Sequence, residues 1–319
     1  MTQELTHVPL GIMFHRFVPD GHRSQQGSLT PDGLRRIIGS FRPGALIPPE
    51  EWIERQAAGR LEGHRCLTFD DGLKRQVEFA LPVLLDLGIP AFWFVPTGVL
   101  GDARPRAEVL AHALDEVDEP AALLRSFCDI AKERDGPPDP QGLRRYTEQA
   151  MRRFPFYSDL DCEFRYVRNA MDLSDLDVTV VEVLHRAGFG ADEYAESVFI
   201  DEDGIRRLHE SGQTIGLHSH SQPYDIAALP IAVQAEEYRR NSEELARLTE
   251  VTPTTVAHPL GSYSDAMLEV LRAFGVVCGF RSEATAGFGI TEGASPLEYA
   301  RIDAAAMVAA ANKGDSRAS

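Results

Sequence analysis

Short, uninterrupted apolar runs recur along both ends of this chain, each bounded by turn residues. They lie at 8–15, 66–69, 91–96, 214–219, 254–259 and 276–280. Runs of this kind are typical of strands buried on both faces of a parallel sheet. The segments between them have apolar residues at helical spacing, and Thr30 and Ser264 stand where helix N-caps are expected. The alternation predicts βα units around a parallel sheet.

The middle of the chain has a different pattern. From 101 to 197 the apolar positions keep helical spacing, polar loops join the segments, and no strand pattern occurs. We interpret 1–319 as a single domain with its core at 8–100 and 198–305, a helical insertion at 101–197 and a disordered tail at 312–319. Two roles are open for the insertion, a cap over the groove or the interface of a homo-oligomer.

Composition excludes some classes of partner. The chain has 319 residues, is 43% hydrophobic and carries a formal charge of -17, which opposes binding to nucleic acid or to an anionic membrane surface. The most apolar stretch, 79–100, contains Asp86 and several prolines, so no membrane span is expected. The first residues lack a secretory pattern, and the cysteines lack CxxC spacing. These features predict a cytoplasmic protein.

Charged and polar side chains stand where the predicted strands end. LTFDDG places Asp70 and Asp71 directly after one strand. Two adjacent carboxylates repel each other unless a cation is near, so one reading is a ligand site. The other is a plain strand-to-helix turn with Asp as N-cap and Gly72 for its backbone freedom.

Histidines follow further strands in the same way. HSHSQP carries His218 and His220, AHPLGSY carries His258, and MFHRF carries His15. Each motif alone also fits an ordinary polar loop. However, the carboxyl ends of parallel strands meet on one face of the sheet, where ligands of such folds bind. The coincidence of these residues at strand ends therefore predicts a catalytic centre.

In this order, GIMFHRF, LTFDDG, AFWFVP, TIGLHSHSQP and TTVAHPLGSY resemble the motifs of the polysaccharide deacetylases, the NodB-homology or carbohydrate esterase four group. The resemblance covers 8–100 and 198–281. It implies a distorted (β/α) barrel with fewer than eight strands. It also implies hydrolysis of an N-acetyl group on a sugar, assisted by a divalent metal, with zinc expected.

The resemblance also implies roles for individual residues. Asp70 takes the place of the general base, and Asp71 and His218 take the places of metal ligands. The Pro-x-Gly turn with Pro259, Gly261 and the nearby Tyr263 is expected to line the groove and to offer backbone N–H to the oxyanion.

The chain departs from the family's pattern at several positions. Gln222 stands four positions after His218, where the family has its second metal histidine, and an amide oxygen is a weaker zinc ligand than an imidazole. His220 is the alternative ligand. No histidine follows His258, so the family's late Leu-x-His acid is missing, and His15, His220, His258 or water must protonate the leaving amine.

We therefore carry forward one leading interpretation and two alternatives. The leading one is a hydrolase that removes an N-acetyl group from a sugar unit of a polysaccharide or its precursor, with Asp70 as base, His15 or His258 as further catalytic residues, and Asp71, His218 and Gln222 (or His220) as metal ligands. The alternatives are a metal-independent C–N hydrolase of the same fold and a catalytically decayed carbohydrate-binding protein.

Overall fold

The computed structural model of this chain describes residues 7–22, 27–101, 103–153, 157–223, 225–282 and 295–308. Its contacts divide the chain into two compact units. The barrel unit comprises Met1–His22, Ser28–Arg104 and Phe199–Ser319, and the helical unit comprises Arg23–Gly27 and Pro105–Val198. The predicted tail at 312–319 lies outside the described residues.

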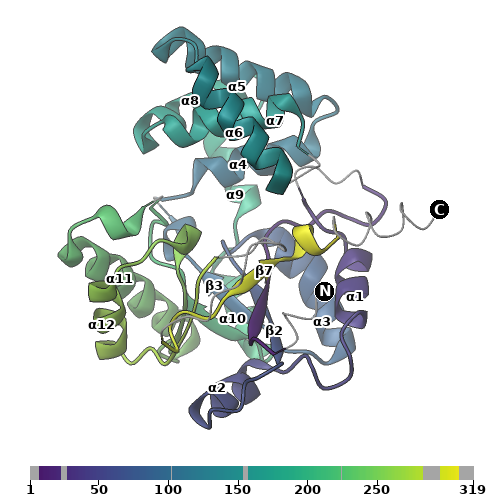
Figure 1. The fold of residues 1–319 in the computed structure, drawn as a ribbon, viewed down its shortest axis with the longest axis vertical. Coiled ribbons are helices and arrows are strands. Elements are labelled where there is room, and N and C mark those ends of the chain that lie inside the picture. The colour runs from purple at the N-terminus through teal and green to yellow at the C-terminus, as the bar shows by residue number, and fades with distance from the viewer. Residues whose placement is uncertain are drawn as a thin grey trace. The chain divides into compact units, whose positions relative to one another are not determined.

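The barrel unit has a sheet of seven parallel strands in the order β6-β5-β4-β3-β2-β1-β7. The sheet lies at the centre of this unit (Figure 1). The strands are β1 (Leu10–Phe14), β2 (Arg65–Phe69), β3 (Phe92–Val95), β4 (Thr214–Leu217), β5 (Thr255–Ala257), β6 (Cys278–Phe280) and β7 (Arg301–Asp303). Every apolar run that the sequence marked as a strand is present. Strand β7 was not predicted.

The two edges of this sheet come close to each other. Strand β7 pairs with β1, and Tyr299, just before β7, forms a parallel bridge with Phe280 of β6. The amide of Arg281 donates to the carbonyl of Tyr299 at 3.0 Å, and the amide of Tyr299 donates to Gly279 at 2.9 Å. The sheet is therefore a nearly closed barrel, and the predicted distorted (β/α) barrel with fewer than eight strands is confirmed.

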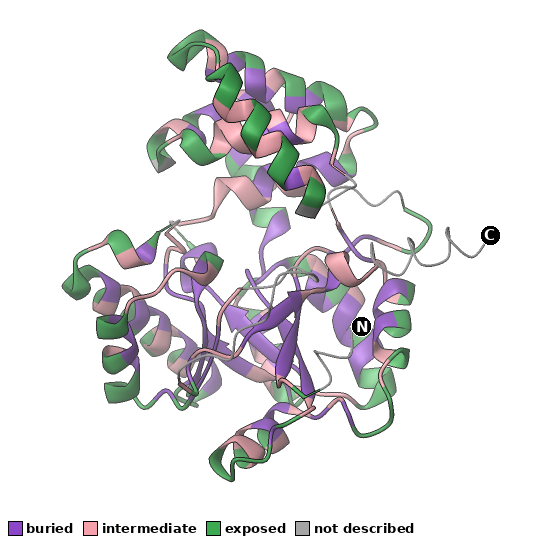
Figure 2. Ribbon diagram, viewed as in Figure 1, coloured by how far each residue is buried: buried purple, intermediate pink, exposed green. Residues whose placement is uncertain are grey.

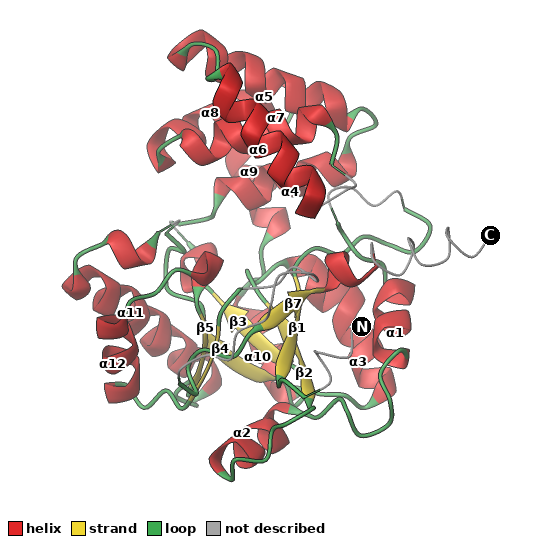
Figure 3. Cartoon of the chain, in the orientation of Figure 1, coloured by secondary structure: helices red, strands yellow, loops and turns green. Residues whose placement is uncertain are grey.

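Helices and short helical turns surround these strands (Figure 3). They are α1 (Pro31–Gly39), α2 (Pro49–Ala57), the π-helix η2 (Gln76–Ala80), α3 (Leu81–Leu87), η3 (Thr97–Leu100), α10 (Glu202–Glu210), η4 (Ile226–Ala228), α11 (Ile231–Thr249), η5 (Pro259–Gly261) and α12 (Asp265–Ala273). The side chain of Thr30 caps α1 and that of Ser264 caps α12, as predicted.

The barrel core is apolar and aromatic. The strands are buried almost throughout, while the surrounding helices expose their outer faces (Figure 2). Phe69 stacks on Phe14 at 5.0 Å and on Trp93 at 4.3 Å between ring centroids. This burial on both faces explains why the strands are continuous apolar runs rather than alternating patterns.

The helical unit contains α4 (Arg106–Glu116), α5 (Pro120–Asp135), α6 (Pro140–Arg153), α7 (Asp159–Ala170), α8 (Leu173–Arg186) and α9 (Ala191–Val198). Its own apolar core includes Leu110, Phe127 and Val180. In the described part of this unit no strand occurs, in line with its sequence pattern. That this segment is an insertion rather than an independent domain stays a prediction. Across the described residues, no helix has the length and apolar character needed to cross a membrane.

Candidate active site

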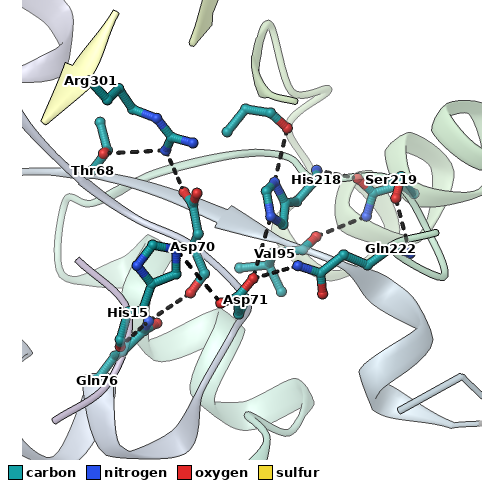
Figure 4. A network of polar contacts seen from close by, with 12 residues as sticks. His15, Thr68, Asp70, Asp71, Gln76, Val95, His218, Ser219, Gln222 and Arg301 are labelled. Carbon is teal, nitrogen blue, oxygen red and sulfur yellow. Dashed lines mark hydrogen bonds and ion pairs between the residues drawn. The ribbon is translucent and has the colours of Figure 1, made fainter. Parts of the chain in front are cut away.

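The carboxyl ends of β1, β2 and β4 bring the predicted site residues together (Figure 4). His15 follows β1, Asp70 and Asp71 follow β2, and His218 follows β4. His15 and His218 both lie within 4 Å of the Asp71 carboxylate. The strands are parallel, so the loops that follow them all lie at the same rim of the barrel. This explains why the residues converge there.

Asp70 is paired with an arginine that sequence reasoning missed. Nη1 of Arg301 donates to Oδ1 of Asp70 at 2.7 Å, and both side chains are buried. Arg301 stands at the start of β7, and its stem passes over Gly11, where a Cβ atom would come within 2.9 Å of Arg301 Cγ. A charged residue inside a short apolar segment, YARID, was the available signal. Buried charges of this kind are normally paired.

Asp71 contacts a different set of groups. Its Oδ1 lies 3.5 Å from Nε2 of His218 and accepts a hydrogen bond from Nε2 of Gln222 at 2.5 Å, and its Oδ2 lies 3.9 Å from Nε2 of His15. Burial alone would raise the pKa of Asp71, but the hydrogen bond with His218, the charges of His15 and His218, and the Gln222 amide together hold this pKa well below its usual range. Asp71 is therefore an anion in this site.

His218 is oriented by a backbone carbonyl. Its Nδ1 lies 2.9 Å from the carbonyl oxygen of Ala257, which can only accept, so Nδ1 carries the proton. The other nitrogen, Nε2, then faces Asp71. Burial lowers the pKa of His218, but the carboxylates of Asp70 and Asp71 outweigh it and raise the pKa. Imidazoles that bind metal are commonly held in this way, with the far nitrogen on a carbonyl or carboxylate.

The HSHSQP loop separates Gln222 from His220. Ser219 and Gln222 both adopt left-handed backbone conformations, at φ 59° and φ 53°. His220 lies with its Nδ1 3.0 Å from Oγ1 of Thr97, whereas Gln222 reaches Asp71. The structure thus brings Gln222, and not His220, to the carboxylate that the sequence assigned to the metal.

His258 directly precedes the Pro-x-Gly turn and is fully buried. Its Nε2 lies 2.9 Å from the carbonyl oxygen of Leu297, and its ring stacks on Tyr263 at 4.4 Å between centroids. Burial lowers the pKa of His258 to about 4, so the ring is neutral near pH 7. A buried neutral imidazole is a poor source of a proton. Of the two candidate acids, His258 is thus fully enclosed, whereas the side chain of His15 is 32% exposed.

The turn itself is tightly bonded within η5. Leu260 and Gly261 have φ 53° and φ 73°, and the amide of Gly261 donates to the carbonyl of His258 at 3.0 Å. Tyr263 donates its hydroxyl to Glu298 at 2.9 Å. The predicted role of Pro259, Gly261 and Tyr263 in binding substrate or an oxyanion stays a prediction, and in this conformation the Gly261 amide is already engaged.

The residues around Asp71 fit a divalent cation in part. Among the described residues, no group of three or more His, Cys, Asp or Glu side chains is arranged to hold a metal. Asp71 and His218 supply a carboxylate oxygen and an imidazole nitrogen that face each other. Oε1 of Gln222 is buried and has no hydrogen-bond partner in the described part of the chain. These residues amount to two strong ligands and one weak neutral oxygen.

Strand-end carboxylates, a fixed imidazole and a buried arginine thus gather at one rim of a parallel (β/α) barrel. A sequence model of the polysaccharide deacetylase family matches residues 171–279, which include HSHSQP and AHPLGSY but not LTFDDG. No curated protein matches the chain.

Solved structures match over almost the whole chain. The deacetylase PplD of Streptococcus pyogenes, solved with acetate, is 14% identical with a TM-score of 0.52, and the alignment covers 95% of this chain and 97% of that one. IcaB of Ammonifex degensii is 16% identical with a TM-score of 0.52, covering 95% and 96%. At such identities the match shows the fold. With the family match, it confirms the resemblance to the polysaccharide deacetylases.

Proposed function

We propose that this protein is a hydrolase that removes an N-acetyl group from a sugar unit of a polysaccharide or its precursor. The observation that carries the proposal is the shared carboxylate of Asp71, which faces Nε2 of His218 beside the Asp70–Arg301 pair. The match of residues 171–279 to the polysaccharide deacetylase family supports the substrate class. We also propose that this protein is cytoplasmic.

Asp70 is the proposed general base. Its Oδ1 is bonded to Arg301, which leaves Oδ2 to accept the proton of the water that attacks the acetyl carbonyl. Arg301 does not touch substrate in this proposal. It holds the carboxylate in one orientation through a charge-assisted hydrogen bond between two buried groups.

Asp71, His218 and Gln222 are the proposed ligands of a divalent cation. A cation bound there supplies Lewis-acid polarisation of the acetyl carbonyl. The protein's own contribution is orientation, since Ala257 fixes the His218 ring and the Gln222 amide has to turn its oxygen toward the site. His15 is the proposed acid for the leaving amine.

The Gln222 amide also supports a second candidate, a C–N hydrolase that works without metal. In the structure, Nε2 of Gln222 places a hydrogen-bond donor on Asp71, where a second histidine ligand would otherwise point. In that case side-chain hydrogen-bond donors, rather than a cation, polarise the substrate carbonyl.

Metal analysis combined with assays of N-acetylated sugar oligomers tests both candidates. Stoichiometric divalent metal and acetate release that stops after chelation support the leading proposal. Acetate release that survives complete chelation supports the metal-free hydrolase. Binding of the oligomer without any turnover overturns both and leaves a carbohydrate-binding protein.

A further inference from the structure

A buried glutamine outside every predicted motif connects the two loops that carry the site. Gln76 is the first residue of the π-helix η2, and its side chain is almost fully buried. Its Nε2 donates to the backbone carbonyl of Asp70 at 2.6 Å and to that of His15 at 2.8 Å (Figure 4). An amide NH₂ group has two hydrogens, so both bonds form at once.

The location of these carbonyls explains what the bonds do. Strands β1 and β2 pair in register up to Phe14 and Phe69, and the last ladder bond runs from the amide of Asp70 to the carbonyl of Phe14. Beyond that bond the strands no longer pair, and the carbonyls of His15 and Asp70 are the next acceptors along each chain. The Gln76 side chain bridges them and extends the pairing by one step.

The carbonyl of Asp70 belongs to the peptide that joins it to Asp71. Asp71 has φ 75°, a conformation that residues other than glycine rarely adopt and that persists only where the surroundings fix it. Fixing the orientation of this peptide fixes both the direction of Asp70 toward Arg301 and the direction of Asp71 toward His218 and Gln222. A π-turn at this place is consistent with the frequent occurrence of such turns at functional sites.

We propose that Gln76 is a positioning residue for the strand-end carboxylates, acting through the Asp70–Asp71 peptide and the His15 carbonyl. This inference rests on the proposed function for its effect on turnover, although its effect on geometry is independent of any reaction. Removal of the two donors leaves the peptide free to rotate. Both carboxylates then lose their set directions while their side chains remain intact.

The chain contains a matched control. Gln234 in α11 is also buried, and its Nε2 donates to the backbone carbonyls of Ala227 at 3.3 Å and Leu229 at 2.7 Å. A Gln→Met substitution there also removes two hydrogen bonds to backbone carbonyls, but Gln234 does not contact the carboxylate of Asp70 or Asp71. Gln76→Met and Gln234→Met remove equal numbers of donors at nearly constant side-chain volume.

The experiment combines kinetics of acetate release with crystal structures of both variants. For Gln76→Met we expect kcat to fall about 10- to 100-fold with KM changed by less than about threefold, since small misplacements of reacting groups carry effects of this size. The crystal structure of that variant should show the Asp70–Asp71 peptide rotated and the contact between Gln222 and Asp71 broken. For Gln234→Met, kcat should remain within about twofold of the wild-type value at a similar melting temperature.

Several outcomes separate this inference from the proposed function. If the wild-type protein releases no acetate, the proposed function fails, and a rotated peptide in Gln76→Met still supports the positioning role. An unrotated peptide with wild-type kcat in Gln76→Met overturns that role. Equal losses of kcat in both variants overturn it as well. If Gln76→Met does not fold, Gln76→Glu keeps the shape and replaces the donors with acceptors, and the same readings apply.

Discussion

Two halves of the candidate site differ in how firmly hydrogen bonds fix the orientation of their side chains. The fixed half consists of Asp70, Arg301 and His258, which are buried. Arg301 donates to Asp70, and His258 is bonded to the carbonyl of Leu297, which can only accept. The adjustable half consists of Asp71 and Gln222, because the Asp71 carboxylate is shared between the fixed His218 ring and an amide that can turn. Adjacent carboxylates on one turn thus have different partners, a guanidinium for Asp70 and an imidazole with an amide for Asp71.

The largest effect is expected from Asp70→Asn, which removes the base and keeps an oxygen to accept from Arg301. Turnover should fall by about 10²–10⁴, the usual contribution of general base catalysis. Divalent cation affinity, measured by calorimetry, should stay near the wild-type value because Asp71 and His218 are unchanged. Asp71→Asn is the matched variant and should weaken the affinity instead. Normal acetate release from Asp70→Asn would sink the assignment of the base.

Arg301→Met should reduce the free energy of unfolding by about 3–5 kcal/mol, because it leaves the carboxylate of Asp70 buried without its cation. Urea unfolding followed by circular dichroism measures this change. Arg247→Met removes an exposed arginine whose partners are Glu202 and Glu244, and should have a much smaller effect. Comparable losses in the two variants would show that the Asp70–Arg301 pair is not set apart by its burial.

His258 should make stability depend on pH in a defined window. Its pKa is about 4 in the folded protein and near 6.5 when unfolded, so between these values only the unfolded chain binds the proton. Stability therefore falls as the pH drops from about 6.5 to about 4, by up to about 3 kcal/mol in total. Urea unfolding at several pH values in this window should show the dependence in wild type. His258→Phe should flatten it, and an unchanged slope in that variant would exclude His258 as its source.

The smallest effect is expected from Gln222→His in the adjustable half. An imidazole in place of the amide should tighten binding of Zn²⁺ by about tenfold, since nitrogen is the better ligand for this metal. Calorimetry under identical conditions measures the change. Gln222→Met is the control that removes both the donor and the oxygen. If the histidine variant binds Zn²⁺ no better than wild type, residue 222 does not occupy a ligand position.

The sequence predicted the barrel well because its strands are buried on both faces and so form continuous apolar runs. The gathering of His15, Asp70, Asp71 and His218 followed from the single rule that carboxyl ends of parallel strands share a face. Strand β7 was missed because YARID is short and interrupted by a charge. The role of its Arg301 is visible only in the folded structure, where the barrel nearly closes and Gly11 leaves space for the arginine side chain.

Two finer features could not be predicted from residue types. The choice between Gln222 and His220 depends on left-handed backbone at Ser219 and at Gln222 itself, which neither residue type favours strongly. Gln76 was hidden because helical periodicity does not distinguish a π-turn from an α-turn, and its partners are backbone carbonyls rather than side chains.

The place of Arg301 in the chain ties chemistry to the order of synthesis. All of the motif residues precede it, and the strand that carries it pairs with β1 near the other end of the sequence. A nascent chain that has not yet reached β7 therefore holds Asp70, Asp71 and His218 but lacks the charge that orients Asp70. Asp70 should therefore gain its paired cation only when β7 docks beside β1.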